Sequence, residues 1–403
     1  MKRFYLILII LTLFESCSYK KEPAIKSLMD NNNSIILSLN TLDVSPVDID
    51  SLFEMVFYIK PEVTEESLIS NYSKVIIKNE KIFIMDNSKS NQAIFIFDMD
   101  GKFLYSINKR GNGPGEYLSI SDFYVDEKNN IIGVLSYSQL LKYDLQGKFI
   151  EKIDLRKHYI SEIVTADNLI YAYTFSQCFT NNCYSLKIFD QQGQLLYEDI
   201  PMRKDLISSP LTGFKTNNLY VDFADNVYLN TIYNDTVFEV NVYRIRPVYI
   251  ADFGQHKLPD KIFSELIEQG NNVDIASVFQ LDYILFGLKN ILFTKDYCYF
   301  TFNGHKSYMS FYSLKTNSIK VIQTINAKDQ IPPFEFIFSD ENYFYNIFPT
   351  LQLIMAKDRF EKAGILEFPD QFSPDSKKYY NEMLRDVKEE DNPMIVAYRI
   401  KCL

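Results

Sequence analysis

Alternating apolar residues interrupted by a glycine turn recur three times in the first half of the chain. The segments IFIFDMDGKFLYSI, LLKYDLQGKFIEKI and LKIFDQQGQLLYEDI each place a short apolar run before an aspartate and another run after the turn. Their turn glycines are Gly101, Gly147 and Gly193, which lie 46 residues apart each time. Period-2 runs on both sides of a glycine turn predict a β-hairpin. A repeat of about 40–50 residues that holds four strands is typical of a propeller blade.

The same spacing extends along the chain and predicts six blades. The sixth unit, which ends with MIVAYRIK at residues 394–401, lacks one strand. An N-terminal strand, such as IILSL (35–39) or MVFYI (55–59), would supply it and close the ring. Closure removes the open sheet edges at which chain ends fray or pair wrongly. We therefore predict an all-β, six-bladed β-propeller of four-stranded antiparallel blades, with its ring closed by an N-terminal strand.

Two stretches depart from the alternating pattern and predict small helical insertions. Residues 258–269 have helical spacing and lie between the fourth and fifth units. Residues 372–393 interrupt the sixth unit, with Ser373 before Pro374 as a helix start and Pro393 beyond the helix end. Structural cover and contact surface both remain open as roles for these insertions.

The N-terminal segment predicts export. Lys2 and Arg3 precede an apolar run over residues 4–14, which is shorter than the roughly 20 residues that span a bilayer. A charged start followed by a short apolar run is the pattern of a secretory signal. The run ends at Cys17, and this arrangement resembles a bacterial lipoprotein signal in which Cys17 becomes the lipidated first residue. An ordinary cleaved signal and an uncleaved anchor are the alternatives.

These boundaries predict a simple organisation. Residues 1–17 would form the lipoprotein signal peptide and lipobox, residues 18–34 a flexible tether, and residues 35–403 a single propeller domain. The membrane is then reached through the lipid anchor.

The charge of the chain excludes one class of partner, and the predicted export determines how the cysteines are interpreted. The formal net charge is −10, whereas nucleic-acid binding needs a basic footprint, so we expect no nucleic-acid partner. An exported chain meets oxidising conditions, and Cys178 and Cys183 are close enough in sequence to form a disulfide. Zinc is the rival interpretation, but further ligands at suitable spacing are not found nearby.

Several phrases of the sequence resemble a known family. They are KRGNGPGEY (109–117), SDFYVDEKNNIIGV (121–134), LLKYDLQGKF (140–149), YNDTVFEV (233–240) and NPMIVAYRIK (392–401). Together they are similar to the six-bladed β-propeller lipoproteins of the bacterial envelope, a largely uncharacterised NHL-like family. The resemblance covers about residues 35–401 and implies an outer-membrane lipoprotein that faces the periplasm or the cell surface. It implies no activity, because that family has no established common one.

The glycine-rich stretch 109–117 does not fit a phosphate-binding loop. A P-loop continues into Lys-Ser/Thr and a helix, whereas the strand DFYVD follows here. Pro114 also removes one of the N–H donors that such a loop would use. We interpret the stretch as a corner between the first and second blades.

Blade topology predicts a binding face. If the strands of a blade are named A to D from the inside outward, the B–C loops and the D-to-A connections fall on one face. Longer loops on a rigid scaffold are where binding residues usually lie. The candidate binding residues on this face are Arg110, Glu116, Tyr117, Tyr137, Asn234, Asp235 and His305.

Candidate catalytic chemistry is sparse. The chain has three histidines and no Gly-x-Ser-x-Gly motif, which favours a ligand- or protein-binding or scaffold module over an enzyme. Its partner would be an envelope protein, a peptide or a glycan. The first alternative is a calcium-dependent hydrolase or lyase, since oxygen ligands suit calcium, although Asp and Asn also cap turns. The second is an accessory or sensor protein in glycan uptake. The candidate oxygen ligands are Asp86, Asn87, Asn230, Asn234, Asp235 and Asn303.

Overall fold

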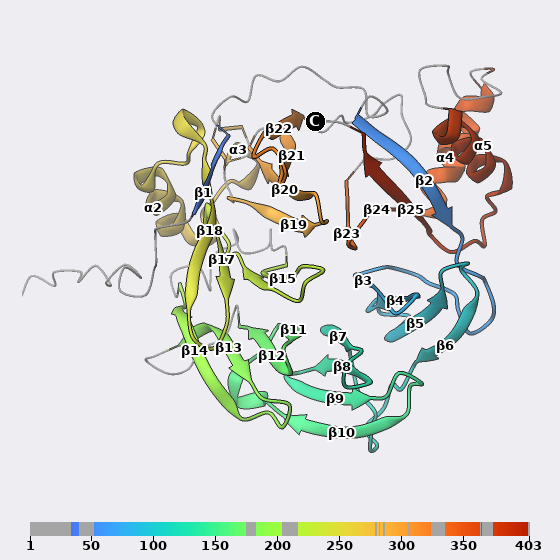
Figure 1. Ribbon diagram of the computed structural model, residues 1–403, viewed down its shortest axis with the longest axis horizontal. Helices are drawn as coiled ribbons and strands as arrows, with labels where there is room; N and C mark the ends of the chain where they lie inside the picture. Colours follow the sequence, from blue (N-terminus) through green and yellow to red (C-terminus); the bar gives the residue numbers. More distant parts are fainter. Residues whose placement is uncertain are drawn as a thin grey trace, which may run out of the picture.

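The computed structural model describes residues 34–39, 52–174, 183–203, 217–278, 280–281, 283–284, 287–304, 306–323, 335–362, 364 and 374–401. These residues form six four-stranded antiparallel blades arranged in a ring, with the first strand of each blade nearest the axis (Figure 1). The six-bladed β-propeller expected from the 46-residue repeat is therefore confirmed.

The first three blades follow the chain without interruption. Blade 1 comprises β3 (Lys74–Lys78), β4 (Lys81–Asp86), β5 (Ala93–Asp98) and β6 (Phe103–Ile107). Blade 2 comprises β7 (Asp122–Asp126), β8 (Ile131–Ser136), β9 (Gln139–Tyr143) and β10 (Phe149–Asp154). Blade 3 comprises β11 (Glu162–Ala166), β12 (Leu169–Tyr173), β13 (Tyr184–Phe189) and β14 (Leu195–Pro201).

The other three blades carry the additions to the repeat. Blade 4 comprises β15 (Leu219–Val221), β16 (Val227–Leu229), β17 (Thr236–Val240) and β18 (Ile245–Asp252). Blade 5 comprises β19 (Lys289–Phe293), β20 (Tyr297–Asn303), β21 (Ser307–Ser313) and β22 (Ile319–Gln323). Blade 6 comprises β23 (Phe338–Ser339), β24 (Phe344–Phe348), β25 (Met394–Ile400) and β2 (Phe53–Ile59).

An N-terminal strand closes the ring, as predicted. Strand β2, which contains the segment MVFYI, pairs antiparallel with β25 and is the outer strand of blade 6. The other N-terminal candidate, β1 (Ile35–Ser38), instead adds a fifth, parallel strand to β18 of blade 4. The N-terminal and C-terminal strands of the ring thus pair in one sheet, and β2 covers the edge of β25 that would otherwise be exposed.

The repeated Asp-x-x-Gly segments form the C–D turns. Asp98 Oδ1 accepts hydrogen bonds from the N–H groups of Asp100 (3.1 Å) and Lys102 (2.8 Å), and Asp144 and Asp190 do the same in blades 2 and 3. Gly101 has a φ of +85°, a conformation that glycine adopts without a steric penalty. The recurrence in sequence is thus a recurrence of one hydrogen-bonded turn.

The two predicted helices are present, and a third was missed. Helix α2 (Asp260–Gln269) follows blade 4, and α5 (Pro374–Asp386) precedes β25. The missed helix, α4 (Thr350–Lys362), follows β24 and packs with α5 beside blade 6. Its apolar side chains lie on both sides of the helix, with Leu353 buried and Met355 exposed. The sequence therefore shows no single apolar face that would predict this helix. The other elements of the described ranges are the short helix α3 (Ile275–Val278) and the single-turn 3-10 helices η2 (Arg156–His158), η5 (Gly254–His256) and η6 (Gly270–Asn272).

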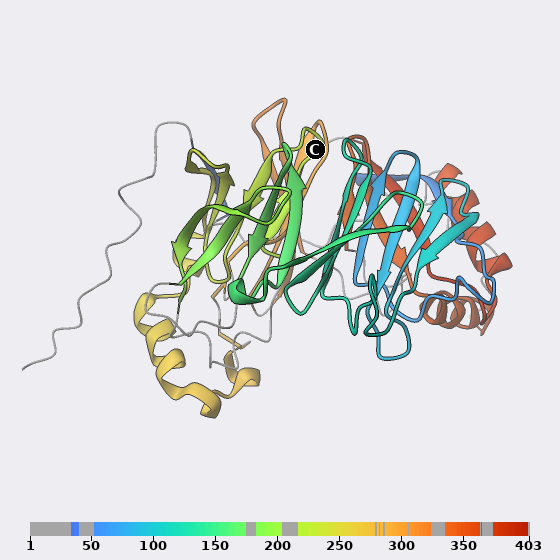
Figure 2. The ribbon, with the colours of Figure 1, turned by 90° about the horizontal axis from the view of Figure 1, so that it is seen from below.

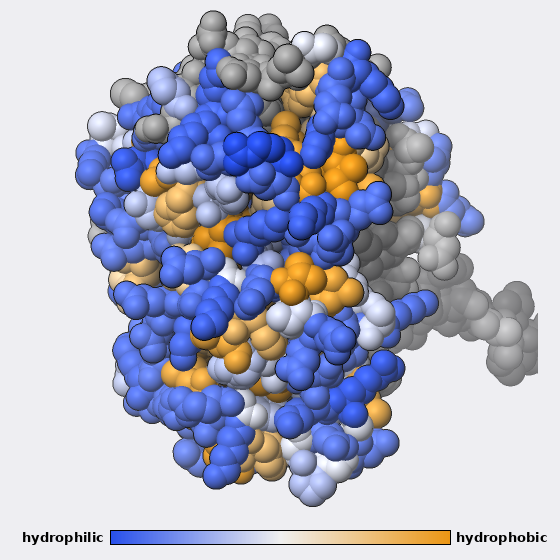
Figure 3. All heavy atoms as spheres, turned by 90° about the vertical axis from the view of Figure 1, so that its right-hand side faces the viewer, coloured by the Kyte–Doolittle hydropathy of each residue, from blue (hydrophilic) through white to orange (hydrophobic). Residues whose placement is uncertain are grey.

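The helices decorate the outside of the ring. Figure 2 shows α2 projecting beyond the strands at one face of the propeller, with α4 and α5 beside the outer strands. The side that carries α4 and α5 is largely hydrophilic, with apolar residues in separate patches (Figure 3). Within the described ranges we find no helix long and apolar enough to cross a membrane.

The core lies between neighbouring blades. Between blades 5 and 6, the ring of Phe53 packs 5.2 Å from that of Phe311 and 5.3 Å from that of Phe336. Tyr299 and Phe344 join the same buried cluster. Large aromatic side chains contribute much of the apolar area buried in such interfaces. The inner strands are consequently held as a rigid wall around the axis.

Candidate functional site

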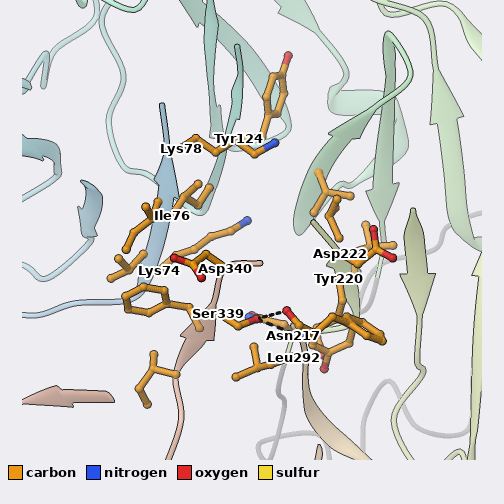
Figure 4. Close-up of a pocket in the computed structure, with 18 of the residues that line it drawn as sticks. Lys74, Ile76, Lys78, Tyr124, Asn217, Tyr220, Asp222, Leu292, Ser339 and Asp340 are labelled. Atoms are coloured by element: carbon orange, nitrogen blue, oxygen red, sulfur yellow. Dashed lines mark hydrogen bonds between the residues drawn. The ribbon is translucent and has the colours of Figure 1, made fainter. Parts of the chain in front are cut away.

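The inner strands of the six blades surround a cavity of about 600 Å³. It runs the length of β3, from Ser73 to Lys78, and Figure 4 shows side chains from several blades directed into it. Each inner strand pairs on one side only, so its other edge presents backbone N–H and C=O groups to the axis. The half-buried apolar side chains of Ile76, Leu292 and Ile337 line the middle. The cavity therefore offers both apolar surface and hydrogen-bonding groups.

One end of the cavity is bounded by an ion pair between neighbouring blades. The Lys74 amine of blade 1 lies 2.7 Å from Oδ1 of Asp122 in blade 2. The other carboxylate oxygen of Asp122 accepts a 2.7 Å hydrogen bond from the N–H of Ile163 in blade 3. This network links three successive inner strands where they begin.

Polar side chains link other pairs of adjacent blades in the same way around the ring. Glu162 Oε2 in blade 3 accepts hydrogen bonds from the N–H groups of Asn218 (2.7 Å) and Leu219 (3.1 Å) at blade 4. Asn290 in blade 5 donates to the carbonyl of Phe336, 2.6 Å away, at blade 6. Near the other end, Ser339 bonds both backbone groups of Phe293, as the dashed lines in Figure 4 mark. These polar residues hold adjacent inner strands together.

The carboxylates at the opposite end of the cavity are held in turns. Asp222 accepts hydrogen bonds from the backbone of Ala224 (2.8 Å) and from the hydroxyl of Tyr228 (3.0 Å). Asp340 likewise accepts a 2.6 Å hydrogen bond from the hydroxyl of Tyr345. Burial, followed by the nearby carboxylate, raises the pKa of each of these two tyrosines. Both aspartates thus stabilise the A–B turns of their blades by accepting these hydrogen bonds.

Glu335 and Lys289 form an oppositely charged pair beside the cavity, and the pKa of each group is shifted. The Glu335 side chain is exposed at the cavity, but the protein around it limits hydration, and this desolvation raises its pKa against the opposing effects of Asn290 and Lys289. Desolvation also lowers the pKa of Lys289, against the attraction of Glu335. Each group therefore carries its charge less readily than it would in water.

None of these cavity residues was singled out from the sequence. They lie in or next to six inner strands that are far apart along the chain. The signal that could have found them is the recurrence of a charged or amide residue at or just before the start of five of the six inner strands: Lys74, Asp122, Glu162, Asn218 and Lys289.

The glycine-rich stretch 109–117 is a corner between blades 1 and 2, as predicted. Tyr117 is buried, and its hydroxyl lies 2.7 Å from the carbonyl of Ile107 and 2.9 Å from that of Gln92. Glu116 accepts a hydrogen bond from the N–H of Gly113 inside the corner. Arg110 and Glu116 are exposed. Tyr117 therefore braces the blades, and only its two charged neighbours face solvent.

Replacing Tyr117 by phenylalanine is expected to lower the free energy of unfolding by about 0.5–1.5 kcal/mol, the usual net contribution of one hydrogen bond. The substitution keeps the ring and leaves the buried Ile107 carbonyl without the hydroxyl donor. Urea denaturation of the purified protein measures the change. Tyr137→Phe, at an exposed hydroxyl, is the matched control and should leave stability unchanged; equal effects at the two positions would contradict the assignment.

The remaining candidates on the loop face separate into two groups. Here the loop face means the face formed by the B–C loops and the D-to-A connections. Tyr137 is 67% exposed at the tip of the β8–β9 turn. Asn234 and Asp235 instead line a second cavity of about 250 Å³ beside α2, where Asp235 pairs with Lys257 at 2.7 Å. Sequence reasoning placed these residues on one face but did not foresee that α2 would help to enclose two of them.

Asp86 and Asn230, two of the candidate oxygen ligands for calcium, are engaged in hydrogen bonds within the protein. Asp86 is fully buried and accepts hydrogen bonds from the N–H groups of Ser70 (2.7 Å) and Ser88 (2.9 Å). Burial acts to raise its pKa, but these and other hydrogen bonds outweigh it, so the pKa is lowered. Asn230 donates to the carbonyls of Asn234 and Thr236. In the described part of the chain, no group of three or more His, Cys, Asp or Glu residues is placed to hold a metal ion.

Several predicted residues fall outside the described ranges. These are Cys17 with the whole signal segment, Cys178 and His305. Cys183 takes part in a disulfide, and its pairing with Cys178 stays a prediction. Cys298 is a buried free thiol whose pKa is raised by burial, as expected for a residue of the core.

Comparison with known proteins agrees with the fold. The "Putative exported protein" of Bacteroides fragilis has a similar structure, with a TM-score of 0.70 and 19% identity over 92% of this chain and 100% of that one. A DUF4221-family member from Bacteroides vulgatus is also similar, with a TM-score of 0.54 and 12% identity over 88% of this chain and 100% of that one. At these identities the likeness shows the fold alone. No curated protein matches the sequence.

The sequence itself also matches a family. The match extends over residues 34–399, which includes all six blades and both insertions. The chain therefore belongs to the family described as "Domain of unknown function (DUF4934)".

Proposed function

We propose that this protein is an exported ligand-binding module of the bacterial envelope, tethered through a lipid on Cys17, and that it binds its ligand in the central cavity. The N-terminal pattern of two cations, a short apolar run and Cys17 supports the export and anchoring. The name of the similar Bacteroides fragilis protein is consistent with export.

The central cavity is the observation that carries the proposal. Its volume of about 600 Å³ is in the range of small-molecule sites, roughly 300–1,000 Å³. Its wall is rigid because each inner strand is bonded to its blade and, through side chains such as Asp122 and Glu162, to the next blade. A preformed wall lowers the ordering cost of binding.

The cavity favours a small amphipathic ligand. Ile76, Leu292 and Ile337 would cover an apolar part, while the unpaired strand edges and Asn290 would bond to polar groups. The end of a peptide or of a glycan has this combination. The carboxylates at its ends are engaged in turns and blade contacts, which supports binding in place of acid–base chemistry.

The experiment is a thermal-shift screen of the mature protein against peptides and oligosaccharides, with two variants. A ligand at one hundred times its Kd stabilises the folded state by about 2.7 kcal/mol. We expect a hit that raises the Tm of the wild type and of Tyr137→Ala but not that of Ile76→Trp, whose larger side chain occupies the cavity. The ligand-free Tm of both variants, close to that of the wild type, serves as the folding control.

Two outcomes would overturn the proposal. A hit that is lost in Tyr137→Ala and kept in Ile76→Trp would move the site to the exposed loops. Hydrolysis of a screened compound in a calcium-dependent manner would instead favour the enzymatic alternative.

A further inference from the structure

We infer that the β15–β16 turn, residues 222–226, is a strap that closes one end of the central cavity, so that a ligand enters only from the loop face. The role of the strap in ligand entry rests on the proposed function. The position of the strap and the experiment that tests it do not require a ligand. The closed end is the turn face, meaning the face formed by the A–B and C–D turns.

The strap crosses the axis of the ring. Asp225 lies 2.8 Å from the amine of Lys128 in blade 2 and 3.5 Å from the amine of Lys78 in blade 1. Blades 1 and 4 are opposite each other in a ring of six, so the contact with Lys78 spans the opening. Figure 1 shows the turn after β15 reaching through the middle of the ring toward β3.

The strap separates two cavities. Beyond it lies a smaller cavity of about 230 Å³, bounded by the A–B turns of blades 1 to 3 and by the strap. Phe223, which is 49% exposed, lines both this cavity and the central one. Lys78 and Thr165 also line both. Phe223 of the strap therefore forms the partition between the cavities together with Lys78, Val125 and Thr165, which come from blades 1 to 3.

The local geometry explains how the strap keeps its shape. Asp222 accepts hydrogen bonds from the N–H groups of Ala224 and Asn226, which folds the turn tightly. Asp225 adopts a φ of +63°, a conformation that Asp and Asn tolerate better than most residues. Burial acts to raise the pKa of Asp225, but Lys128 and Lys78 together lower it.

The loop-face end has a different arrangement. Its ion pair, Lys74 with Asp122, joins blades 1 and 2, which are neighbours, and so runs along the wall. The contacts of Glu162 and Asn290 likewise join adjacent blades. Among the ion pairs between described residues, only that of Lys78 with Asp225 joins opposite blades. At the turn face an ion pair therefore crosses the opening of the cavity, whereas at the loop face the polar contacts stay along the wall.

The closure is reversible on electrostatic grounds. The side chains of Lys78 and Lys128 remain 34% and 68% exposed. Ion pairs with this exposure are individually weak and are screened by salt. The strap can consequently open without unfolding a blade, since Asp222 keeps the turn folded when the ion pairs break.

Cysteine labelling tests the strap. Thr165→Cys places a thiol between the two cavities, and its reaction with N-ethylmaleimide is followed by mass spectrometry in the mature full-length protein. We expect Asp225→Asn to raise the labelling rate about fivefold, as loss of a weak closing interaction would. Asn preserves the positive φ, so the turn can keep its fold. The same protein without Thr165→Cys gives the background from native thiols.

Asp167→Asn is the matched control. Asp167 lies on the neighbouring β11–β12 turn, also has a positive φ and lines the smaller cavity, but it makes no direct ion pair with the strap. It should leave the labelling rate unchanged. Raising salt to 0.5 M should increase labelling in the parent and in Asp167→Asn, and have little effect in Asp225→Asn.

Two results would overturn the strap. One is an equal labelling rate in the parent and in Asp225→Asn; the other is an equal increase in both aspartate variants, which would indicate a general charge effect. Lys78→Met removes the opposite half of the crossing pair and should reproduce the increase, so the test remains decisive if Asp225→Asn folds poorly. Because no ligand is added, failure here is distinct from failure of the thermal-shift screen.

Discussion

Phe53→Ala is expected to destabilise the protein by about 3–5 kcal/mol, the usual cost of removing a buried phenylalanine ring. Phe53 is 1% exposed on the closing strand β2, and its ring packs against Phe311 of blade 5 and Phe336 beside blade 6. The substitution therefore leaves a cavity where the N-terminal strand holds the ring shut. Urea denaturation followed by far-UV circular dichroism measures the loss.

The matched control is Phe223→Ala, the same truncation at a ring that is 49% exposed. It should change the free energy of unfolding far less, because little buried area is lost. If Phe53→Ala proved as mild as the control, β2 would not be closing the ring in solution. Its pairing with β25 would then contribute little to stability.

Asp122→Ala is expected to cost about 2–4 kcal/mol, since it removes one partner of a largely buried ion pair. The Lys74 amine would lose its carboxylate partner and keep only the carbonyl of Ile163, while the N–H of Ile163 would lose its acceptor. Because three blades share this carboxylate, the loss should also reduce the cooperativity of unfolding. Calorimetry of the variant measures both effects.

Two further variants separate the ion pair from the carboxylate itself. Asp154→Ala removes the partner of Arg156 at an exposed site and should have little effect. The double variant Lys74→Met with Asp122→Leu removes both charges and should recover part of the stability lost in Asp122→Ala. No recovery would mean that the bond to Ile163, and not the charge pair, dominates.

Local pattern accounts for the parts of the fold that repeat. The Asp-x-x-Gly turns around Gly101 and its two equivalents could be read directly, because each turn is made by residues at most four positions apart. Helices α2 and α5 were visible for the same reason. Helix α4 was missed because Leu353 and Met355 face opposite environments, so burial by blade 6, and not sequence periodicity, determines its orientation.

The candidate site could be predicted only in part. Sequence topology assigned Tyr137 and Asn234 to the loop face, yet Asn234 lies beside α2, which belongs to an insertion. The cavity residues were not predicted because Lys74, Asp122 and Glu162 belong to no motif in their own segments of the sequence. Their roles arise from contacts between blades, which no local window contains.

The sequence by itself determined the number of blades, the hairpins, the corner at 109–117 and the need for an N-terminal closing strand, since these follow from alternation and short-range hydrogen bonds. Only the tertiary structure decided which strand closes the ring, what the inner edges enclose and where the cavity is bridged. Those features join residues as distant as Lys78 and Asp225, whose approach depends on the closure of the whole ring.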